Sequence, residues 1–248
     1  MFKNYLKGIK AYGGTFNLIS TLGLWRYFLV PMIISFITAS IIGFAAWGWS
    51  DNLGALLAKI WIWDWGAETF RSISNFIGGV TIIALGIILY KHTVMALCAP
   101  FMSPVSEKIE SHITDKEIVI AKNRFLPLLW RGIKVNGRNL IMELLFTIPI
   151  LLLGFIPIIG LLSTPLLFLV QAYYAGFGNM DYTLERHLDA NKSAQFVRLH
   201  SGLAMGNGTI FMLMLLIPIV GIILVFPLLV TAATTTTLEV LCSKEQKS

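Results

Sequence analysis

Charged residues are scarce in this sequence, and their scarcity excludes an ordinary water-soluble domain. Aspartate, glutamate, lysine and arginine together make up 13% of the residues, whereas 56% of the residues are hydrophobic. With a mean hydropathy of +0.75, one soluble core could not bury all of these apolar side chains. The composition therefore predicts an integral membrane protein.

Cysteine and the sequence signatures of enzymes are also nearly absent. Cys98 and Cys242 are the only cysteines, and neither has a C-x-x-C or histidine spacing. No disulfide framework or metal site is indicated. The patterns H-E-x-x-H and G-x-S-x-G do not occur. Acidic and histidine residues gather between positions 181 and 200, but a polar turn explains them more simply than catalysis. We predict a protein that is not an enzyme and uses no metal or cofactor.

Acidic residues are missing from the first 26 positions, although four basic residues occur there. Apolar residues lie beside these basic residues, so segment 1–26 predicts an amphipathic helix in the cytoplasmic interface. Residues 27–49 follow without a charge. A cleavable signal peptide would have a shorter apolar region and a small-residue cleavage site, so 27–49 predicts a permanent transmembrane span. Residues 72–90 are likewise uncharged and predict a second span.

The distribution of basic residues predicts the orientation in the membrane. Segment 50–71 has two basic and three acidic residues, whereas segment 91–139 has eight basic and four acidic residues. By the positive-inside rule, segment 91–139 should be a cytoplasmic helical portion, and both termini should be cytoplasmic. The isoelectric point near 9.4 could suggest nucleic acid. However, no recognition motif is present, so anionic lipid headgroups or an anionic solute explain the basic residues better.

Prolines interrupt two long charge-free runs in a similar way. Ile156-Pro157-Ile158-Ile159-Gly160 and Ile217-Pro218-Ile219-Val220-Gly221 each combine a lost backbone donor with a permissive glycine, so the chain should turn there. The limbs before the two breaks would be about 18 and 21 Å long, against a hydrocarbon core of about 30 Å. We favour two half-penetrating, re-entrant hairpins, at 140–180 and 199–238, over four further spans.

The hairpins alone do not decide the function. Non-helical backbone in lipid is tolerated against protein or a water-filled cavity, and transporters use broken helices to build solute sites. The same hairpins could instead be structural wedges in a membrane scaffold. From the residues alone, transport and scaffolding both remain open.

The sharpest candidate for a binding site precedes the first span, at Thr21 to Tyr27. Gly23 permits a backbone turn, a following helix N-terminus presents free N–H groups, and Arg26 adds a multidentate cation, so these residues could bind an oxyanion. The simpler alternative is that Arg26 is a positive-inside residue at the membrane edge. Glu107 and Glu110 lie one helical turn apart with Lys108 between them, which is also common on a solvated helix.

Short motifs in a fixed order resemble one known family. They are Gly23-Leu24-Trp25-Arg26-Tyr27, Ala99-Pro100-Phe101 followed by Glu107 and Glu110, Ile156 to Gly160, Asp181-Tyr182 with His187, and Ile217-Pro218 with Pro227 and Ala232-Ala233-Thr234. The sequence resembles the CysZ family of bacterial sulfate permeases, whose superfamily includes the etoposide-induced proteins of the eukaryotic endoplasmic reticulum. The resemblance runs from about Gly8 to Leu241.

The resemblance implies a fold and an anion site. The fold would be all-α, with two long transmembrane helices, two pairs of half-penetrating helices and a cytoplasmic helical portion, assembled as homo-oligomers in the bacterial inner membrane. The family's Gly-(Leu/Ile)-Arg-Arg sulfate motif corresponds to Gly23, Leu24, Trp25 and Arg26. Trp25 replaces the first arginine, and the loss of one charge-assisted bond would weaken the binding of a dianion by about 1.5–3 kcal/mol.

The resemblance also implies a polar pathway through Glu107, Lys108, Glu110 and Arg138. Because carboxylates repel sulfate, we expect the two acids to be paired with Lys108, Arg131 or Arg138. The resulting prediction is a permease that carries sulfate or a related oxyanion into the cytoplasm. The alternative is an oligomeric membrane scaffold or assembly factor without transport activity.

Overall fold

The computed structural model describes residues 1–58, 67–116, 124–153, 159–217 and 220–245. The elements in the described parts are helical, and no strand occurs among them. They are α1 (Phe2–Lys10), η1 (Ala11–Gly14), α2 (Thr15–Thr21), η2 (Leu24–Phe28), α3 (Leu29–Ala58), α4 (Ala67–Thr114), α5 (Phe125–Leu153), α6 (Ile159–Leu184), α7 (Ala190–Leu199), α8 (Ser201–Leu215) and α9 (Val220–Glu245).

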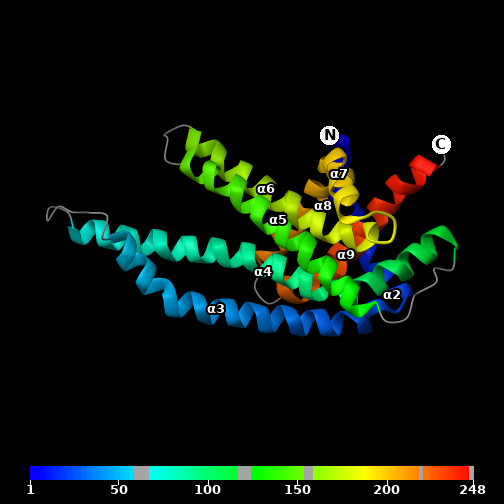
Figure 1. Cartoon of the computed structure of the whole chain (residues 1–248), viewed down its shortest axis with the longest axis horizontal. Coiled ribbons are helices and arrows are strands. Elements are labelled where there is room, and N and C mark those ends of the chain that lie inside the picture. Colours follow the sequence, from blue (N-terminus) through cyan, green and yellow to red (C-terminus); the bar gives the residue numbers. More distant parts are fainter. Residues whose placement is uncertain (59–66, 117–123, 154–158, 218–219, 246–248) are drawn as a thin grey trace.

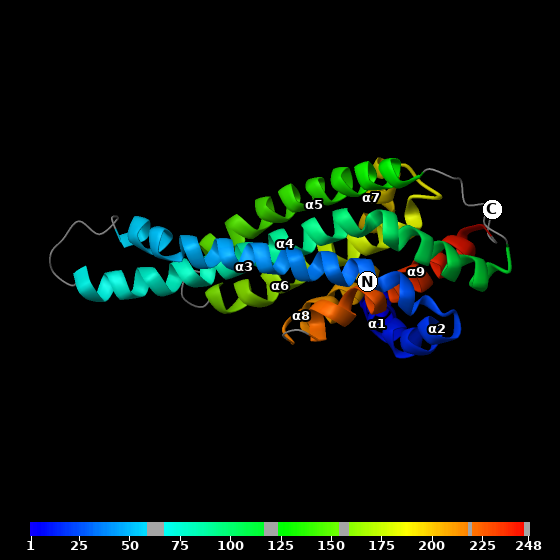
Figure 2. The ribbon, with the colours of Figure 1, turned by 90° about the horizontal axis from the view of Figure 1, so that it is seen from below.

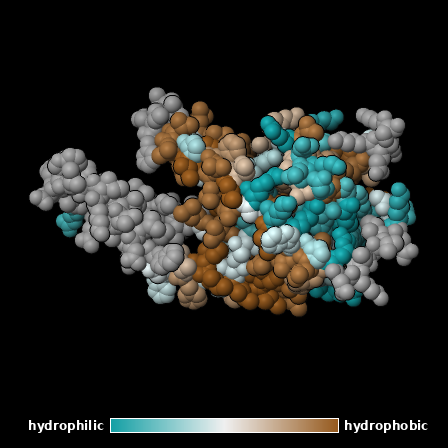
Figure 3. All heavy atoms as spheres, viewed as in Figure 1, coloured by the Kyte–Doolittle hydropathy of each residue, from teal (hydrophilic) through white to brown (hydrophobic). Residues whose placement is uncertain are grey.

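Four described stretches are long and apolar enough to cross a membrane. They are Leu24–Gly48, Leu85–Thr114, Phe125–Leu153 and Val225–Ser243. A multi-pass, all-helical membrane protein follows from these lengths and compositions, as the composition of the whole chain predicted. Hydrophilic side chains gather over the half of the molecule that holds α7 and the ends of α4 and α9, and hydrophobic side chains cover much of the described remainder (Figure 3).

Helices α3 and α4 form the longest antiparallel pair of the fold (Figures 1 and 2). α3 includes most of the first predicted span, and α4 includes the second. α4 has 48 residues and continues through Pro100 and Pro104. At about 1.5 Å per residue it is much longer than a hydrocarbon core is thick. Helix α4 therefore contains the second predicted span, 72–90, and continues past residue 90 to include Glu107 and Glu110.

Two further helix pairs contain the predicted hairpins. α5 and α6 run side by side in opposite directions, and α8 and α9 contact each other as well (Figure 1). Residues 154–158 and 218–219, which include the prolines of both breaks, lie outside the described residues. The limb before the first break, expected to be about 18 Å long, begins at Leu144. Leu144 lies inside the 29-residue helix α5, so this limb is not a separate helix.

Glycines bring α8 into backbone contact with both α1 and α6. A side-chain carbon at Gly206 would overlap the carbonyl of Tyr5 in α1, and one at Gly208 would overlap the carbonyl of Ala172 in α6. A carbon at Gly176 of α6 would likewise overlap Ala204 of α8. Small residues permit this close approach of membrane helices. α1 is therefore packed into the bundle, although Phe2 remains 73% exposed.

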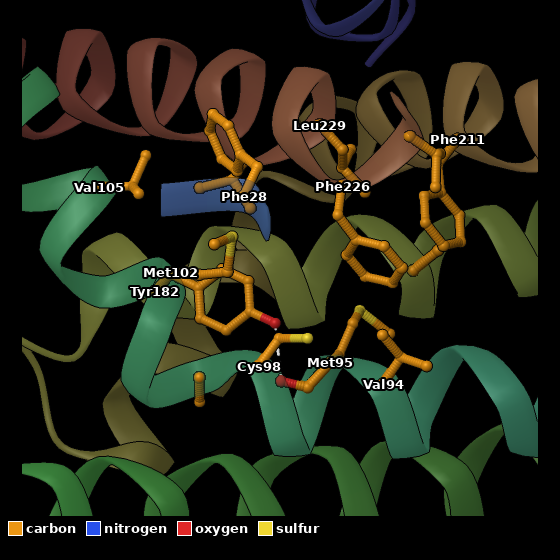
Figure 4. Close-up of a cluster of buried hydrophobic side chains, with 14 of the residues drawn as sticks. Phe28, Val94, Met95, Cys98, Met102, Val105, Tyr182, Phe211, Phe226 and Leu229 are labelled. Carbon is orange, nitrogen blue, oxygen red and sulfur yellow. Dashed lines mark hydrogen bonds between the residues drawn. The ribbon is translucent and has the colours of Figure 1, made fainter. Parts of the chain in front are cut away.

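A hydrophobic core joins the start of α3 to four other helices (Figure 4). Phe28 from η2, Met102 from α4, Phe211 from α8 and Phe226 from α9 are almost completely buried in it. The hydroxyl of Tyr182 in α6 donates a hydrogen bond of 2.7 Å to the carbonyl of Met95. Close packing of these large side chains stabilises the bundle through van der Waals contacts between the helices. This core fixes the position of the segment that precedes α3.

Candidate functional site

The candidate site begins at a sharp backbone turn between α2 and η2. Gly23 has φ +60° and ψ 35°, which is the left-handed conformation that glycine adopts without a steric penalty. Nothing lies within 4 Å of a side-chain carbon built at this glycine. The requirement for glycine is therefore conformational rather than one of space. The turn follows α2 and leads into η2, whose five residues directly precede α3.

The residues after this turn point in different directions. Leu24 is completely buried in the hydrophobic core. Trp25 packs edge-on against Phe16, with ring centroids 5.3 Å apart, and against Phe28 at 6.5 Å. Its indole Nε1 donates a hydrogen bond of 3.2 Å to Ser20. The tryptophan thus fastens α2 to the turn, and its one polar hydrogen is already used.

Arg26 is the exposed cation of this segment. Its Nη2 donates a hydrogen bond of 3.3 Å to the Tyr27 hydroxyl, and its guanidinium carbon is 5.1 Å from the centroid of the Tyr27 ring. The ammonium of Lys108, from α4, lies 4.6 Å from the same centroid. No acid among the described residues forms an ion pair with Arg26 or Lys108.

A pocket of about 430 Å³ lies beside this segment. It is bounded by the N-terminal helices, by α4 and by α9. Its lining residues are Ala11, Gly14, Thr15, Asn17, Leu18, Thr21, His112 and Thr235. Hydroxyl, amide and imidazole groups thus face a space that reaches Thr21, two residues before the glycine turn. The hydroxyls of Thr15 and Thr235 already donate to the carbonyls of Tyr12 and Thr231. The amide of Asn17 and the imidazole of His112 are groups of the kind that can donate to a hydrated anion.

The acid pair of α4 is paired with two arginines that the sequence did not single out, and with His187. Glu107 accepts a bond of 2.7 Å from Arg124, which directly precedes α5. Glu110 accepts bonds of 2.6 and 2.8 Å from Arg186 and lies 2.8 Å from Nε2 of His187. The expected partners, Lys108, Arg131 and Arg138, were therefore wrong.

The two predicted arginines of α5 contact other groups. Arg131 forms two hydrogen bonds, of 3.0 and 2.9 Å, to the carboxylate of Asp181, and a third of 2.9 Å to Ser193. Arg138 lies over the Phe177 ring, 5.4 Å from its centroid. Of the predicted pathway residues, Glu107, Lys108 and Glu110 share one stretch of α4, and the structure does not bring Arg138 to them.

Hydroxyl groups continue the network around Glu110 into the interior. Ser106, Thr183 and Thr234 form a triangle of hydrogen bonds of 2.9, 3.1 and 3.0 Å that joins α4, α6 and α9. Arg186 also donates a bond of 2.8 Å to Ser106. All three hydroxyl residues are completely buried. The network ties the charged end of α4 to the two helices that follow the proline breaks.

A second charged cluster lies deeper, between α4 and α5. Lys91, His92 and Glu143 are buried together, and the two basic side chains contact opposite oxygens of the carboxylate at 2.6 and 2.8 Å. Sequence reasoning missed this cluster. Its signal was Glu143 itself, an acid at the edge of a long apolar run, because a charge at membrane depth requires a partner.

Asp181, His187 and His200, in and beside the polar turn between α6 and α8, make separate contacts. Asp181 is held by Arg131, His187 faces Glu110, and Nδ1 of His200 lies 2.8 Å from the Phe196 carbonyl. The residues thus serve three separate contacts. Among the described residues, no group of three or more histidine, cysteine, aspartate or glutamate side chains could hold a metal ion.

Comparison with known proteins covers most of this arrangement. The model of the family described as sulfate transporter CysZ/etoposide-induced protein 2.4 matches residues 11–227, which include the glycine turn, both charged clusters, the α5–α6 pair, α8 and the first residues of α9. The chain belongs to this family. The family expected from the motifs is therefore confirmed, and its description is that of a transporter.

Two relatives named sulfate transporter CysZ align with this chain over nearly their whole length. A protein named sulfate transporter CysZ from Pseudomonas aeruginosa (strain LESB58) is 27% identical over 244 residues, which cover 92% of this chain and 93% of the relative. One of the same name from Pseudomonas paraeruginosa (strain DSM 24068 / PA7) is 28% identical over 242 residues, with the same shares covered. At this identity the relatives support the family and the membrane setting.

Proposed function

We propose that the protein is a permease of the bacterial inner membrane that carries sulfate or a related oxyanion into the cytoplasm. The observation that carries this proposal is the exposed guanidinium of Arg26 directly after the Gly23 turn, in a segment with no acidic ion-pair partner among the described residues. An arginine is well suited to bind an oxyanion because its planar group donates several fixed hydrogen bonds. The names of the relatives support sulfate as the solute.

The proposal includes a topology with both termini in the cytoplasm and two half-penetrating helix pairs. Arg131, Lys134 and Arg138 occupy the first half of α5, so its remaining charge-poor part, residues 139–153, is about 22 Å long. α8 has 15 residues and is equally short. A span needs about 30 Å. The ends of α5 and α8 would then lie inside the bilayer and pack against a second copy of the chain in a homo-oligomer.

Flux of labelled sulfate into proteoliposomes tests the proposal. The purified protein should accelerate sulfate uptake over empty liposomes, and Arg26→Ala should reduce the uptake at least about tenfold, since one charge-assisted bond is worth about 1.5–3 kcal/mol. The matched control is Arg198→Ala, which removes a different arginine, in α7. Absence of sulfate, sulfite and other oxyanion flux from the folded wild type would contradict the proposal and favour a membrane scaffold.

A further inference from the structure

Two cations from different helices meet at one tyrosine in the candidate site. Arg26 belongs to η2 and Lys108 to α4, 82 positions later in the sequence. Their charged groups lie 5.1 and 4.6 Å from the centroid of the Tyr27 ring. These distances limit the separation of the charges to about 10 Å, near one Debye length at physiological ionic strength. The two positive charges are therefore close enough to interact electrostatically.

The acids that flank Lys108 in the sequence do not balance it. Glu107 is paired with Arg124, and Glu110 with Arg186 and His187. Along α4, the two acids thus pair with residues from other elements, and Lys108 lies at the Tyr27 ring, as Arg26 does. Like charges held this close repel each other. A bound anion would relieve this repulsion.

Trp25 cannot supply the missing donor, because its indole N–H bonds to Ser20 and its ring packs against Phe16 and Phe28. Tyr27 adds a donor instead. Its oxygen accepts a hydrogen bond from Arg26, and a phenol that accepts one bond still has its own O–H to donate. Lys108 on α4 thus provides a positive charge in place of the one that Trp25 lacks.

We propose that Lys108 is the second cation of the anion site and that Arg26, Tyr27 and Lys108 together bind a divalent tetrahedral oxyanion. This inference rests on the proposed function and names the ligand class of that site. A dianion gains from both cations at once, whereas a monoanion such as nitrate is balanced by one of them. Lys108 therefore determines the preference for divalent over monovalent oxyanions. Because Lys108 lies between Glu107 and Glu110, the same site also connects the segment before α3 to the charged network of α4.

Calorimetric titration of the purified protein with sulfate and with nitrate tests this assignment. Lys108→Gln should weaken sulfate binding about tenfold or more, the cost of one charge-assisted bond, and change nitrate binding less than about threefold. Lys134→Gln removes the same charge from an exposed position on α5 and should leave both affinities unchanged. Tyr27→Phe should weaken sulfate binding by a smaller factor than Lys108→Gln, because it removes an uncharged donor.

Variants that move or keep the positive charge of Lys108 distinguish an effect on anion binding from an effect on folding. Trp25→Arg, combined with Lys108→Gln, should restore at least part of the sulfate affinity by placing a cation on η2. Lys108→Arg should retain most of it. The midpoint of thermal denaturation in detergent, measured for each variant, shows whether a lost affinity reflects a lost fold.

The outcomes distinguish this inference from the proposed function. If the wild type binds and transports sulfate but Lys108→Gln behaves like Lys134→Gln, the role of Lys108 is overturned and the permease function stands. If the wild type neither binds nor transports any divalent oxyanion, both are overturned. Equal loss of sulfate and nitrate in Lys108→Gln would overturn the assignment of selectivity.

Discussion

Glu143 of α5 accepts a hydrogen bond of 2.6 Å from the ammonium of Lys91 of α4, and both side chains have no exposed surface. Lys91 donates a second bond, of 3.1 Å, to the carbonyl of Gln171 in α6. His92 approaches the other carboxylate oxygen at 2.8 Å. One carboxylate thus balances the charge at a junction of three helices. The ion pair is tolerated here because the partners satisfy each other away from water.

Breaking this pair should be strongly destabilising. Glu143→Gln leaves the Lys91 ammonium buried without a counter-charge, and we expect a loss of about 3–5 kcal/mol in the free energy of unfolding. The measurement is the midpoint of thermal denaturation in detergent micelles. The double variant Lys91→Met with Glu143→Leu removes both charges and should recover most of the loss. A double variant as unstable as Glu143→Gln would contradict this electrostatic explanation.

Gly208→Ala should force α6 and α8 apart. The added methyl group would overlap the carbonyl of Ala172, and backbone cannot move as a flexible side chain can. We expect a loss of about 1–3 kcal/mol or more in the free energy of unfolding. Gly137→Ala is the matched control, because nothing lies within 4 Å of its added carbon and alanine favours a helix. A control that lost as much stability as Gly208→Ala would refute the contact.

The sequence predicted the class of fold because composition and charge-free runs act locally. The length of the apolar run before Trp49 is enough to predict a span, and the conformational freedom of Gly23 is enough to predict a turn. Helix α4 is longer than the predicted second span, because it continues through Pro100 and Pro104 to Thr114. Packing against α5, α6 and α9 stabilises it there, and local propensity does not include that contribution.

The partners of the charged residues could not be predicted because they are far apart in the sequence. Glu110 and Arg186 are separated by 76 positions, and no local spacing indicates such a pair. The partner of Glu107, Arg124, is only 17 positions away, nearer in the sequence than Arg131 or Arg138, but no local spacing distinguished it from them. The role of Lys108 beside Tyr27 was hidden for the same reason, since its neighbours in sequence are acids that turn out to be satisfied elsewhere.

Glu185 should make the protein less stable as the pH rises. Burial removes the water that would solvate its carboxylate and raises the pKa of Glu185 to about 7. The folded protein therefore holds this proton more tightly than the unfolded chain does. The resulting stability is fully present below about pH 4.5, the ordinary pKa of glutamate, and is lost as the pH rises through about 7.

Glu185→Gln isolates this effect from other titrations. The wild type should lose up to about 3 kcal/mol between pH 5 and 8 relative to the variant, whose amide stays neutral throughout. The two denaturation midpoints should thus diverge toward high pH, with the variant the more stable. Parallel pH profiles for the wild type and the variant would show that Glu185 has no raised pKa in the folded protein.

The depth of the two helix pairs can be decided with single cysteines near their tips. Leu162 at the start of α6 and Leu216 after α8 are 70% and 69% exposed, so a thiol at either position is free to react if water reaches it. In a background with Cys98→Ala and Cys242→Ser, Leu162→Cys and Leu216→Cys should resist a membrane-impermeant maleimide added outside the cells. Trp47→Cys, 78% exposed near the predicted external end of the first span, should be labelled and serves as the positive control.

We expect protection at positions 162 and 216 because the apolar parts of α5 and α8 are about 22 Å long. A helix of this length that enters from the cytoplasmic face ends within a hydrocarbon core of about 30 Å. Maleimides react with thiolates in water, and a thiol inside lipid is protected from either side. Leu199→Cys, 75% exposed between the two pairs, should react only in inside-out vesicles. Labelling of position 162 or 216 from outside at the rate of position 47 would mean that the helices cross completely. The chain would then have six spans, and the anion site would lie on a different framework from the one proposed.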